Sequence, residues 1–405
     1  MPDGYIDELL RAWRPLLGAF IGMACGMSMV GTITSTLVPS ILAETQWSQA
    51  EFAKVGALSI FMALVFPFIG RLTDLLGVRW TALIGQASLP LIYLAYSRMD
   101  GDIASYKLIF IVQSLICVTT TATVYSRLAV QYVEKARGLA LAFVVSGPAL
   151  AGMVVGPLLN SYVEANGWRG SFVTIAIFTA IAGLIAFLLI PRDSAPARGT
   201  ATPKRRARED YPLIFRTTAF WFLLAAMALC NLPLTLLLVQ LKNLVLANGI
   251  TGEGAALMLA AAPFGQLVGR FVAGVAIDRY NAYIVAFITM ALPSLGLFVV
   301  ASDFNAPMII TAAVFFIGFA FGAEGDVVAF LVARHFGVSI YSSVMGLLTA
   351  VMSISTASGA WLLGWSMERS GGSFDLFLTI TGFAVLIGAT LLLVLGRINR
   401  AAASA

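Results

Sequence analysis

The chain has 405 residues, of which 60% are hydrophobic and 11% are charged, with a formal net charge of +5 at pH 7. A soluble domain carries roughly 25% charged residues, so this composition is typical of a protein that crosses a membrane many times. The single histidine, His335, excludes a multi-histidine metal centre, and three cysteines far apart in apolar segments exclude a disulfide framework. The sequence lacks a nucleotide-binding Gly-x-x-x-x-Gly-Lys-[Ser/Thr] loop, so we expect neither ATP-driven transport nor any cofactor.

Apolar runs of about 20 residues predict an all-α membrane protein with twelve transmembrane helices. The predicted spans are 15–39, 52–70, 79–97, 106–130, 137–161, 168–190, 218–241, 254–276, 282–301, 307–332, 340–365 and 374–396. Residues 1–14 are polar, so no cleavable signal is expected. The segment from Pro191 to Arg216 is rich in Arg, Pro and Ala and is predicted to be disordered. The chain is therefore expected to form an N-terminal six-helix bundle over 1–190, a cytoplasmic linker over 191–217 and a C-terminal six-helix bundle over 218–405.

The distribution of basic residues predicts the orientation. If both termini and the linker share one side, that side holds 18 of the 25 Lys and Arg residues, and the other side holds six. The positive-inside rule makes the first side cytoplasmic. We therefore expect a multi-pass protein of the cytoplasmic (inner) membrane with both termini in the cytoplasm. The net charge follows from this topology, so a nucleic-acid partner is not expected.

Two parts of the sequence recur about 204 residues apart. The segment from Gly70 to Arg79 matches that from Gly274 to Arg279, and each copy follows a long apolar run. The segment from Gly156 to Phe172 likewise matches that from Gly359 to Phe374. Two homologous halves with charge at the same helix–helix turn predict two pseudo-symmetric bundles and point to a secondary transporter.

The Gly-x-x-x-Asp-x-x-Gly-x-Arg turn at residues 70–79 resembles the signature of the major facilitator superfamily, and the resemblance covers nearly the whole chain. The basic residue usual after the aspartate is Leu75 here, whereas the second copy keeps an Asp-Arg pair. In that family these turns latch helices on the cytoplasmic side. The resemblance thus implies a gating role, and the alternative is that the charges only determine topology. The residues concerned are Asp74, Arg79, Asp278 and Arg279.

A finer resemblance connects three segments to the branch that holds monocarboxylate transporters and oxalate/formate exchangers. These segments are Tyr132 to Gly147, Ala262 to Gly274 and Ser370 to Asp375. The resemblance implies a small organic anion as substrate. Gln266 stands where many monocarboxylate carriers have an aspartate one turn before the arginine. Because residues 340–365 contain no Lys or Arg, a dicarboxylate held between two cations is disfavoured.

Arg270 is the leading candidate for a substrate contact. It lies eight residues before Asp278, which places it about 12 Å inside the membrane from the turn. A charge at that depth is costly unless it is paired or faces a wet cavity, and a guanidinium binds carboxylates with two parallel hydrogen bonds. Gln266 lies one turn away on the same face and could orient the arginine or the substrate. The alternative is a structural ion pair with another helix.

Glu324 and Asp326 are the candidates for proton coupling. They are two residues apart, about 200° around a helix, so both cannot face one cavity. Competition between a substrate anion and Glu324 for Arg270 would link proton movement to transport, and the alternative is a structural carboxylate–arginine pair.

Polar residues at helical spacing predict further side chains that line a central cavity. They lie in spans that line the cavity in the major facilitator superfamily, which this chain resembles. Each hydroxyl could instead bond to its own helix, and Arg127 is expected to extend its side chain toward the cytoplasmic surface. The candidates are Ser28, Thr32 and Ser35 in the first span, Thr119 and Thr123 in the fourth, and Asn231 and Thr235 in the seventh.

We therefore expect a monomeric secondary transporter of a small monocarboxylate-type anion that works by alternating access, either by proton symport or by anion exchange. One alternative is proton-driven efflux of an apolar or cationic metabolite, although Arg270 would repel cations. Another is a non-transporting membrane receptor of the same fold. An enzyme is disfavoured because the sequence offers no metal cluster or nucleophile–histidine pattern.

Overall fold

The structure is a computed structural model. It describes residues 4–47, 60–192, 207–236, 252–302, 306–371 and 373–404, together with residues 52, 55 and 58. Throughout these ranges the regular elements are helices. The predicted all-α membrane fold is therefore confirmed.

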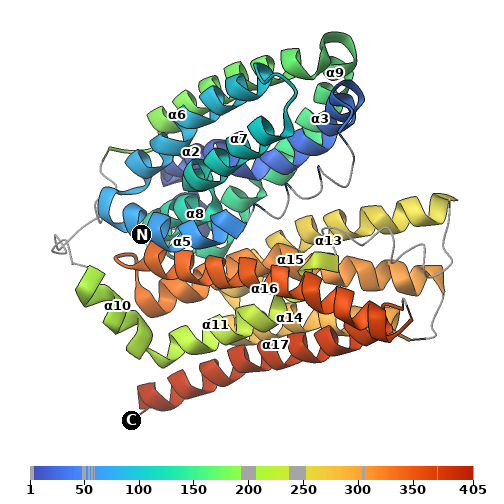
Figure 1. Cartoon of the computed structure of the whole chain (residues 1–405). Coiled ribbons are helices and arrows are strands. Elements are labelled where there is room, and N and C mark those ends of the chain that lie inside the picture. Colours follow the sequence, from blue (N-terminus) through green and yellow to red (C-terminus); the bar gives the residue numbers. More distant parts are fainter. Residues whose placement is uncertain are drawn as a thin grey trace. The chain divides into compact units, whose positions relative to one another are not determined.

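The described part of the first half consists mainly of α-helices (Figure 1), and it also contains two short 3-10 turns, η1 and η2. Its elements are α1 (Tyr5–Arg11), α2 (Trp13–Ala24), η1 (Met27–Met29), α3 (Val30–Thr45), α5 (Ile60–Leu76), α6 (Val78–Ser97), α7 (Ile103–Ile116), η2 (Cys117–Thr120), α8 (Ala122–Tyr132) and α9 (Arg137–Leu189).

The second half begins with a short helix and continues with longer ones (Figure 1). Its elements are α10 (Ala207–Arg216), α11 (Thr218–Cys230), α13 (Gly252–Arg279), α14 (Ala282–Val300), α15 (Pro307–Phe336), α16 (Tyr341–Arg369) and α17 (Asp375–Ser404).

The described helices lie at all twelve predicted span positions. Within the described ranges, six helices are long and apolar enough to cross a membrane, or eight if each of two bent pairs is one span. The 53-residue α9 contains two of the predicted spans, because Gly167 (φ 69°, ψ 172°) is not helical and divides it by a kink where the sequence places a turn. Helices α5, α6 and α13 lie at the remaining predicted positions.

Three predicted spans are broken near their middle. The first bends by 40° between α2 and α3. The fourth changes to the 3-10 turn η2 and then to an extended residue, Thr121. In the seventh, α11 ends at Cys230, two residues before the Leu232-Pro233 pair, and residues 237–241 of the predicted span lie outside the described ranges. Proline explains the last break, since it lacks an N–H and clashes with the preceding turn.

The expectation of disorder between Pro191 and Arg216 is wrong for residues 207–216, which form α10. This helix is amphipathic: Asp210 and Ile214 are buried, whereas Leu213 and Phe215 are exposed. Packing of this buried side stabilises the helix, and the composition of the segment does not reveal such packing. Residues 193–206 of the predicted linker lie outside the described ranges.

The chain forms two compact units. Unit 1 comprises Met1–Lys135, Phe143–Arg205 and Phe336–Ala350, and unit 2 comprises Ala136–Ala142, Arg206–His335 and Val351–Ala405. Unit 1 thus includes the start of α16, and unit 2 includes the start of α9. The aromatic residues Tyr93, Tyr96 and Phe172 form part of the core of unit 1, and Leu297, Val314 and Phe377 form part of that of unit 2.

Candidate functional site: two helix-capping turns and a buried charge cluster

Within unit 1, Asp74 near the end of α5 caps the start of α16. Its carboxylate accepts hydrogen bonds from the backbone N–H groups of Ser342 at 3.1 Å and Ser343 at 2.7 Å. The first N–H groups of a helix have no partner within the helix and carry a partial positive charge, so a carboxylate is well suited to this position. Gly70, one turn earlier, allows the close approach, since a Cβ there would overlap the carbonyl oxygen of Ser342.

Arg127 of α8 completes this cluster. Its Nη1 forms an ion pair with the Asp74 carboxylate and lies 3.3 Å from the Ser342 hydroxyl. The residue is only 6% exposed. The expectation that Arg127 extends toward the surface is therefore wrong, because a buried carboxylate is available as its partner.

Arg79, which the resemblance groups with Asp74, bonds elsewhere. Its Nη1 donates to the carbonyl oxygen of Ile190, just past the end of α9, and its guanidinium lies 4.0 Å from the centroid of the Phe187 ring. Unsatisfied carbonyl groups at a helix C-terminus attract a cation. In the structure Arg79 therefore supports the end of α9, and Arg127 is the arginine that pairs with Asp74.

Unit 2 repeats the capping arrangement. The Asp278 carboxylate accepts from the N–H groups of Gly138 at 2.7 Å and Leu139 at 3.1 Å, at the start of α9. A Cβ on Gly274 would overlap the carbonyl oxygen of Gly138. Every residue in this set lies 204 positions from its counterpart around Asp74. The repeat seen in the sequence thus extends to individual hydrogen bonds. Arg279 follows the cap at the end of α13.

A glycine contact between α13 and α15 positions Arg270 in unit 2. Gly265 and Gly269 of α13 lie against the backbone of Phe315 and Phe319, and Gly318 and Gly322 of α15 lie against that of Ala262 and Gln266. Small residues let two membrane helices approach this closely. Each glycine pair has a spacing of four residues, which places both of its members on one face of the helix.

This contact brings Arg270 beside Asp326. The Arg270 Nε lies 4.0 Å from the Asp326 Oδ2, and the two side chains are 11% and 1% exposed. Gln266 is half-buried one turn before Arg270. The pair is long for a hydrogen bond, so it is a loose ion pair in a poorly hydrated setting.

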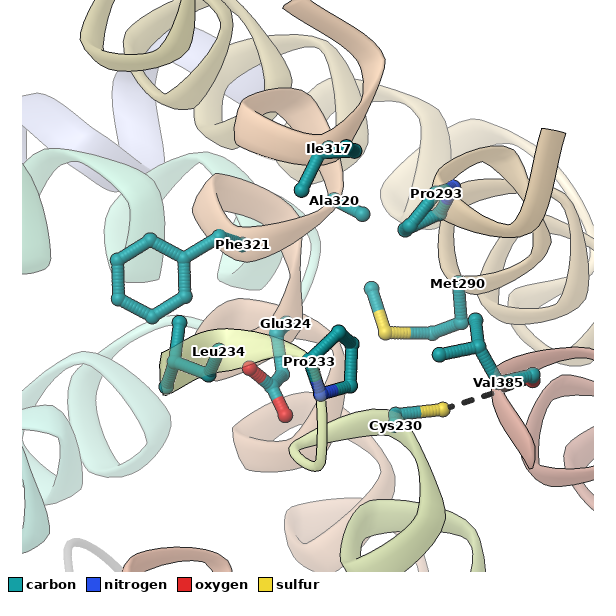
Figure 2. Close-up of a pocket in the computed structure, with 10 residues that line it drawn as sticks. All are labelled: Cys230, Pro233, Leu234, Met290, Pro293, Ile317, Ala320, Phe321, Glu324 and Val385. Atoms are coloured by element: carbon teal, nitrogen blue, oxygen red, sulfur yellow. Dashed lines mark hydrogen bonds between the residues drawn. The ribbon is translucent and has the colours of Figure 1, made fainter. Parts of the chain in front are cut away.

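Glu324 points to a different neighbour. Its carboxylate accepts a hydrogen bond from the Asn231 side chain, just past the end of α11. Figure 2 shows Glu324 at the wall of a small cavity whose other lining residues include Cys230, Pro233 and Met290. The cavity volume is about 30 Å³, which holds a water molecule but no organic substrate.

The two carboxylates of α15 thus face different helices, as their spacing predicts. The prediction that Glu324 competes with the substrate for Arg270 names the wrong carboxylate, however. Asp326 lies beside Arg270, whereas Glu324 is bonded to Asn231. Sequence spacing places each side chain on a face of its helix but does not say which helix that face meets.

The predicted cavity residues of unit 1 have different surroundings. Ser28 and Ser35 line a cavity of about 600 Å³, together with Met62, Phe110 and Thr121. Thr32 packs beside the position a Cβ of Gly152 would take. Thr119 donates to the carbonyl oxygen of Ile116, 2.9 Å away, and Thr123 lies 3.4 Å from the Thr349 hydroxyl.

Thr121 was not among the sequence candidates. It lies between the two predicted threonines, Thr119 and Thr123, and is the extended residue that precedes α8. The break in the span turns it toward the cavity, and a pattern based on continuous helical spacing misses it.

Comparisons with known proteins agree on the family. Residues 19–360 match the model of the Major Facilitator Superfamily. The chain is 23% identical over 404 residues to the fujikurins efflux protein of Gibberella fujikuroi, covering 96% of this chain and 83% of that protein. It is 25% identical over 268 residues to monocarboxylate transporter 11 of Homo sapiens, covering 64% of this chain and 56% of the relative.

Solved structures of transporters share the fold. The fucose:proton symporter FucP of E. coli aligns with a TM-score of 0.71 at 11% identity, covering 93% of this chain and 98% of that one. The human organic anion transporter MFSD10 aligns with a TM-score of 0.71 at 14% identity, covering 94% and 99%.

Proposed function

This chain belongs to the Major Facilitator Superfamily and is a multi-pass membrane transporter rather than an enzyme, and we propose that its substrate is a small organic anion of the monocarboxylate type. The coupling we propose is proton symport or anion exchange, by alternating access of a single chain.

The observation that carries this proposal is the buried pair of Arg270 and Asp326. A guanidinium inside a transmembrane helix needs a counter-charge, and such residues usually mark a substrate or ion pathway. Asp326 supplies the counter-charge through a 4.0 Å contact rather than a short hydrogen bond. A substrate carboxylate offering two hydrogen bonds to the guanidinium is therefore able to replace it.

Proton coupling follows from the same exchange. When the substrate carboxylate occupies Arg270, Asp326 is left as a second buried anion next to it. Protonation of Asp326 removes that charge, so one proton accompanies each anion and the site stays neutral overall. Glu324, bonded to Asn231 beside the small cavity, is the second candidate for a proton-carrying residue.

The names of two similar proteins support an anionic substrate, since one is called a monocarboxylate transporter and another an organic anion transporter. We further propose that the termini and the capping turns lie on the cytoplasmic side of the cytoplasmic membrane, where 18 of 25 basic residues fall. The capping aspartates, together with Arg79 at the end of α9 and Arg279 next to Asp278, would then gate that side.

A second candidate is efflux of an apolar metabolite. It is favoured by the alignment with the fujikurins efflux protein, which covers 96% of this chain at 23% identity. In that case Arg270 and Asp326 would form a structural pair.

Uptake of labelled carboxylates into proteoliposomes, with and without an inward proton gradient, tests the proposal. We expect saturable uptake of at least one monocarboxylate, its loss in Arg270→Gln, and partial recovery in Arg270→Lys, which keeps the charge without the fork. Arg169→Gln is the matched control, because it breaks an arginine–carboxylate pair, with Glu44, that is exposed. Transport by Arg270→Gln at the wild-type rate would contradict the proposal and favour efflux.

A further inference from the structure

The N-terminal helix α1 makes a contact that the transport scheme leaves unexplained. The two Glu8 carboxylate oxygens accept hydrogen bonds from the backbone N–H groups of Glu134 and Lys135, each at 2.8 Å. All three residues belong to unit 1. A carboxylate that binds two successive backbone amides, 126 and 127 residues away in sequence, fixes the position of that loop segment.

This loop segment leads directly into the start of α9. Gly138 and Leu139, three and four residues after Lys135, give their N–H groups to Asp278. The chain between α8 and α9 is therefore held by one carboxylate before the helix begins and by another in its first turn.

The opposite side of α1 is apolar and exposed. Ile6 is 67% exposed, Leu10 is 64% exposed, and Trp13 at the start of α2 is 52% exposed. Their spacing of four and three residues places them on one face, and Glu8 lies two residues from both Ile6 and Leu10, about 200° around the helix.

The bilayer surface is the partner that fits this face. A single residue, Ala12, separates α1 from α2, which begins the first membrane span, so α1 lies at the level of the membrane–water interface. Tryptophan is enriched at that level, and amphipathic helices lie there with their apolar face in the headgroup region. The second half of the chain starts in the same way: α10 meets α11 at a 71° bend, with Leu213, Phe215 and Trp221 exposed.

We propose that α1 is an interfacial strap: Ile6, Leu10 and Trp13 anchor it in the bilayer surface, and Glu8 uses that anchor to hold the loop before α9. The strap holds Glu134 and Lys135 in place within unit 1. It requires no particular substrate, so this proposal stands independently of the proposed anion.

Hydrogen exchange of the protein in phosphatidylcholine nanodiscs tests the hold on the loop. Loss of both Glu8 hydrogen bonds in Glu8→Ala should speed exchange at Glu134 and Lys135 about tenfold, with a smaller effect in Glu8→Gln. Glu164→Ala is the control, because that exposed carboxylate bonds to Asn160 within its own helix. Unchanged exchange at Glu134 and Lys135 in Glu8→Ala would overturn the proposal.

Spin labels on α1 test the bilayer anchor separately. Labels are attached to single cysteines introduced by Ile6→Cys, Asp7→Cys or Leu10→Cys, after the three native cysteines are changed to Ser. Labels at positions 6 and 10 should be more accessible to oxygen, which dissolves in lipid, than to a water-soluble nickel chelate, and the label at position 7 should show the reverse. Equal accessibility at all three positions would refute the anchor even if the loop contact holds.

Discussion

The two repeats keep the same helix caps but place their buried arginine–aspartate pairs at different depths. Asp74 and Asp278 cap helices through hydrogen bonds that correspond at an offset of 204 residues. In unit 1 the arginine partner, Arg127, is at the cap itself. In unit 2 Arg270 pairs with Asp326 within the spans.

The residues at the corresponding offsets show how far the halves have diverged. At the offset of 204 residues, Leu331 corresponds to Arg127, Phe66 to Arg270, and Ala122 to Asp326. The shared caps suit a movement that both halves make, whereas the charge pair inside the spans of unit 2 suits chemistry that only one half performs. This contrast leads us to assign gating to the repeated contacts and substrate recognition to unit 2.

The largest expected effect is on proton coupling. Asp326→Asn removes the counter-charge of Arg270 and the group that takes up the proton in the proposed scheme. Carboxylate accumulation driven by a proton gradient should be abolished, while exchange of labelled for unlabelled carboxylate should continue. Gradient-driven accumulation that survives in this variant would move the proton to Glu324, which Glu324→Gln then tests.

The next effect is on stability in unit 1. Arg127→Gln leaves Asp74 as a buried carboxylate without its ion-pair partner. Removing one partner of a buried pair typically costs about 3 kcal/mol, so thermal unfolding in detergent should begin several degrees lower. An unchanged unfolding temperature would show that the two backbone N–H groups alone suffice to hold Asp74.

The glycines beneath the two caps should respond alike. A methyl group in Gly70→Ala or Gly274→Ala meets a backbone carbonyl of the capped helix, Ser342 or Gly138. Overpacking of this kind costs about 1–3 kcal/mol, and we expect the two losses, measured by thermal unfolding, to agree within about 1 kcal/mol. A large loss at one position alone would contradict the equivalence of the caps.

The smallest expected effect is that of Asp278→Asn. Asparagine keeps one acceptor for Gly138 and Leu139 but loses the charge at the helix N-terminus, which is worth about 1 kcal/mol. Asp74→Asn should cost more, because it also leaves Arg127 without a counter-charge. Equal unfolding temperatures for the two variants would remove the distinction between the caps.

The sequence predicted what depends on repetition and hydropathy. The repeat located both capping aspartates, and the depth of Arg270 in an apolar run marked it as a buried charge that requires a partner. It could not choose Asp326 over Glu324, because the helix that each face meets is decided by the Gly265, Gly269, Gly318 and Gly322 contact between α13 and α15.

Contacts in the tertiary structure explain two of the other differences, and a local break explains the third. Arg127 was expected at the surface because its partner lies 53 residues away on another helix. Thr121 was missed because the fourth span stops being helical just before it. The burial that makes α10 a helix depends on the tertiary structure and not on its composition.

The most direct test of the assignment of substrate recognition to unit 2 is carboxylate counterflow in proteoliposomes. It is measured side by side for wild type, Arg270→Gln and Arg127→Gln at equal amounts of folded protein. The account predicts no exchange in Arg270→Gln and slowed but substrate-saturable exchange in Arg127→Gln, since only the first variant loses the anion's binding partner. Exchange that persists in Arg270→Gln and disappears in Arg127→Gln would contradict it and place substrate recognition in unit 1.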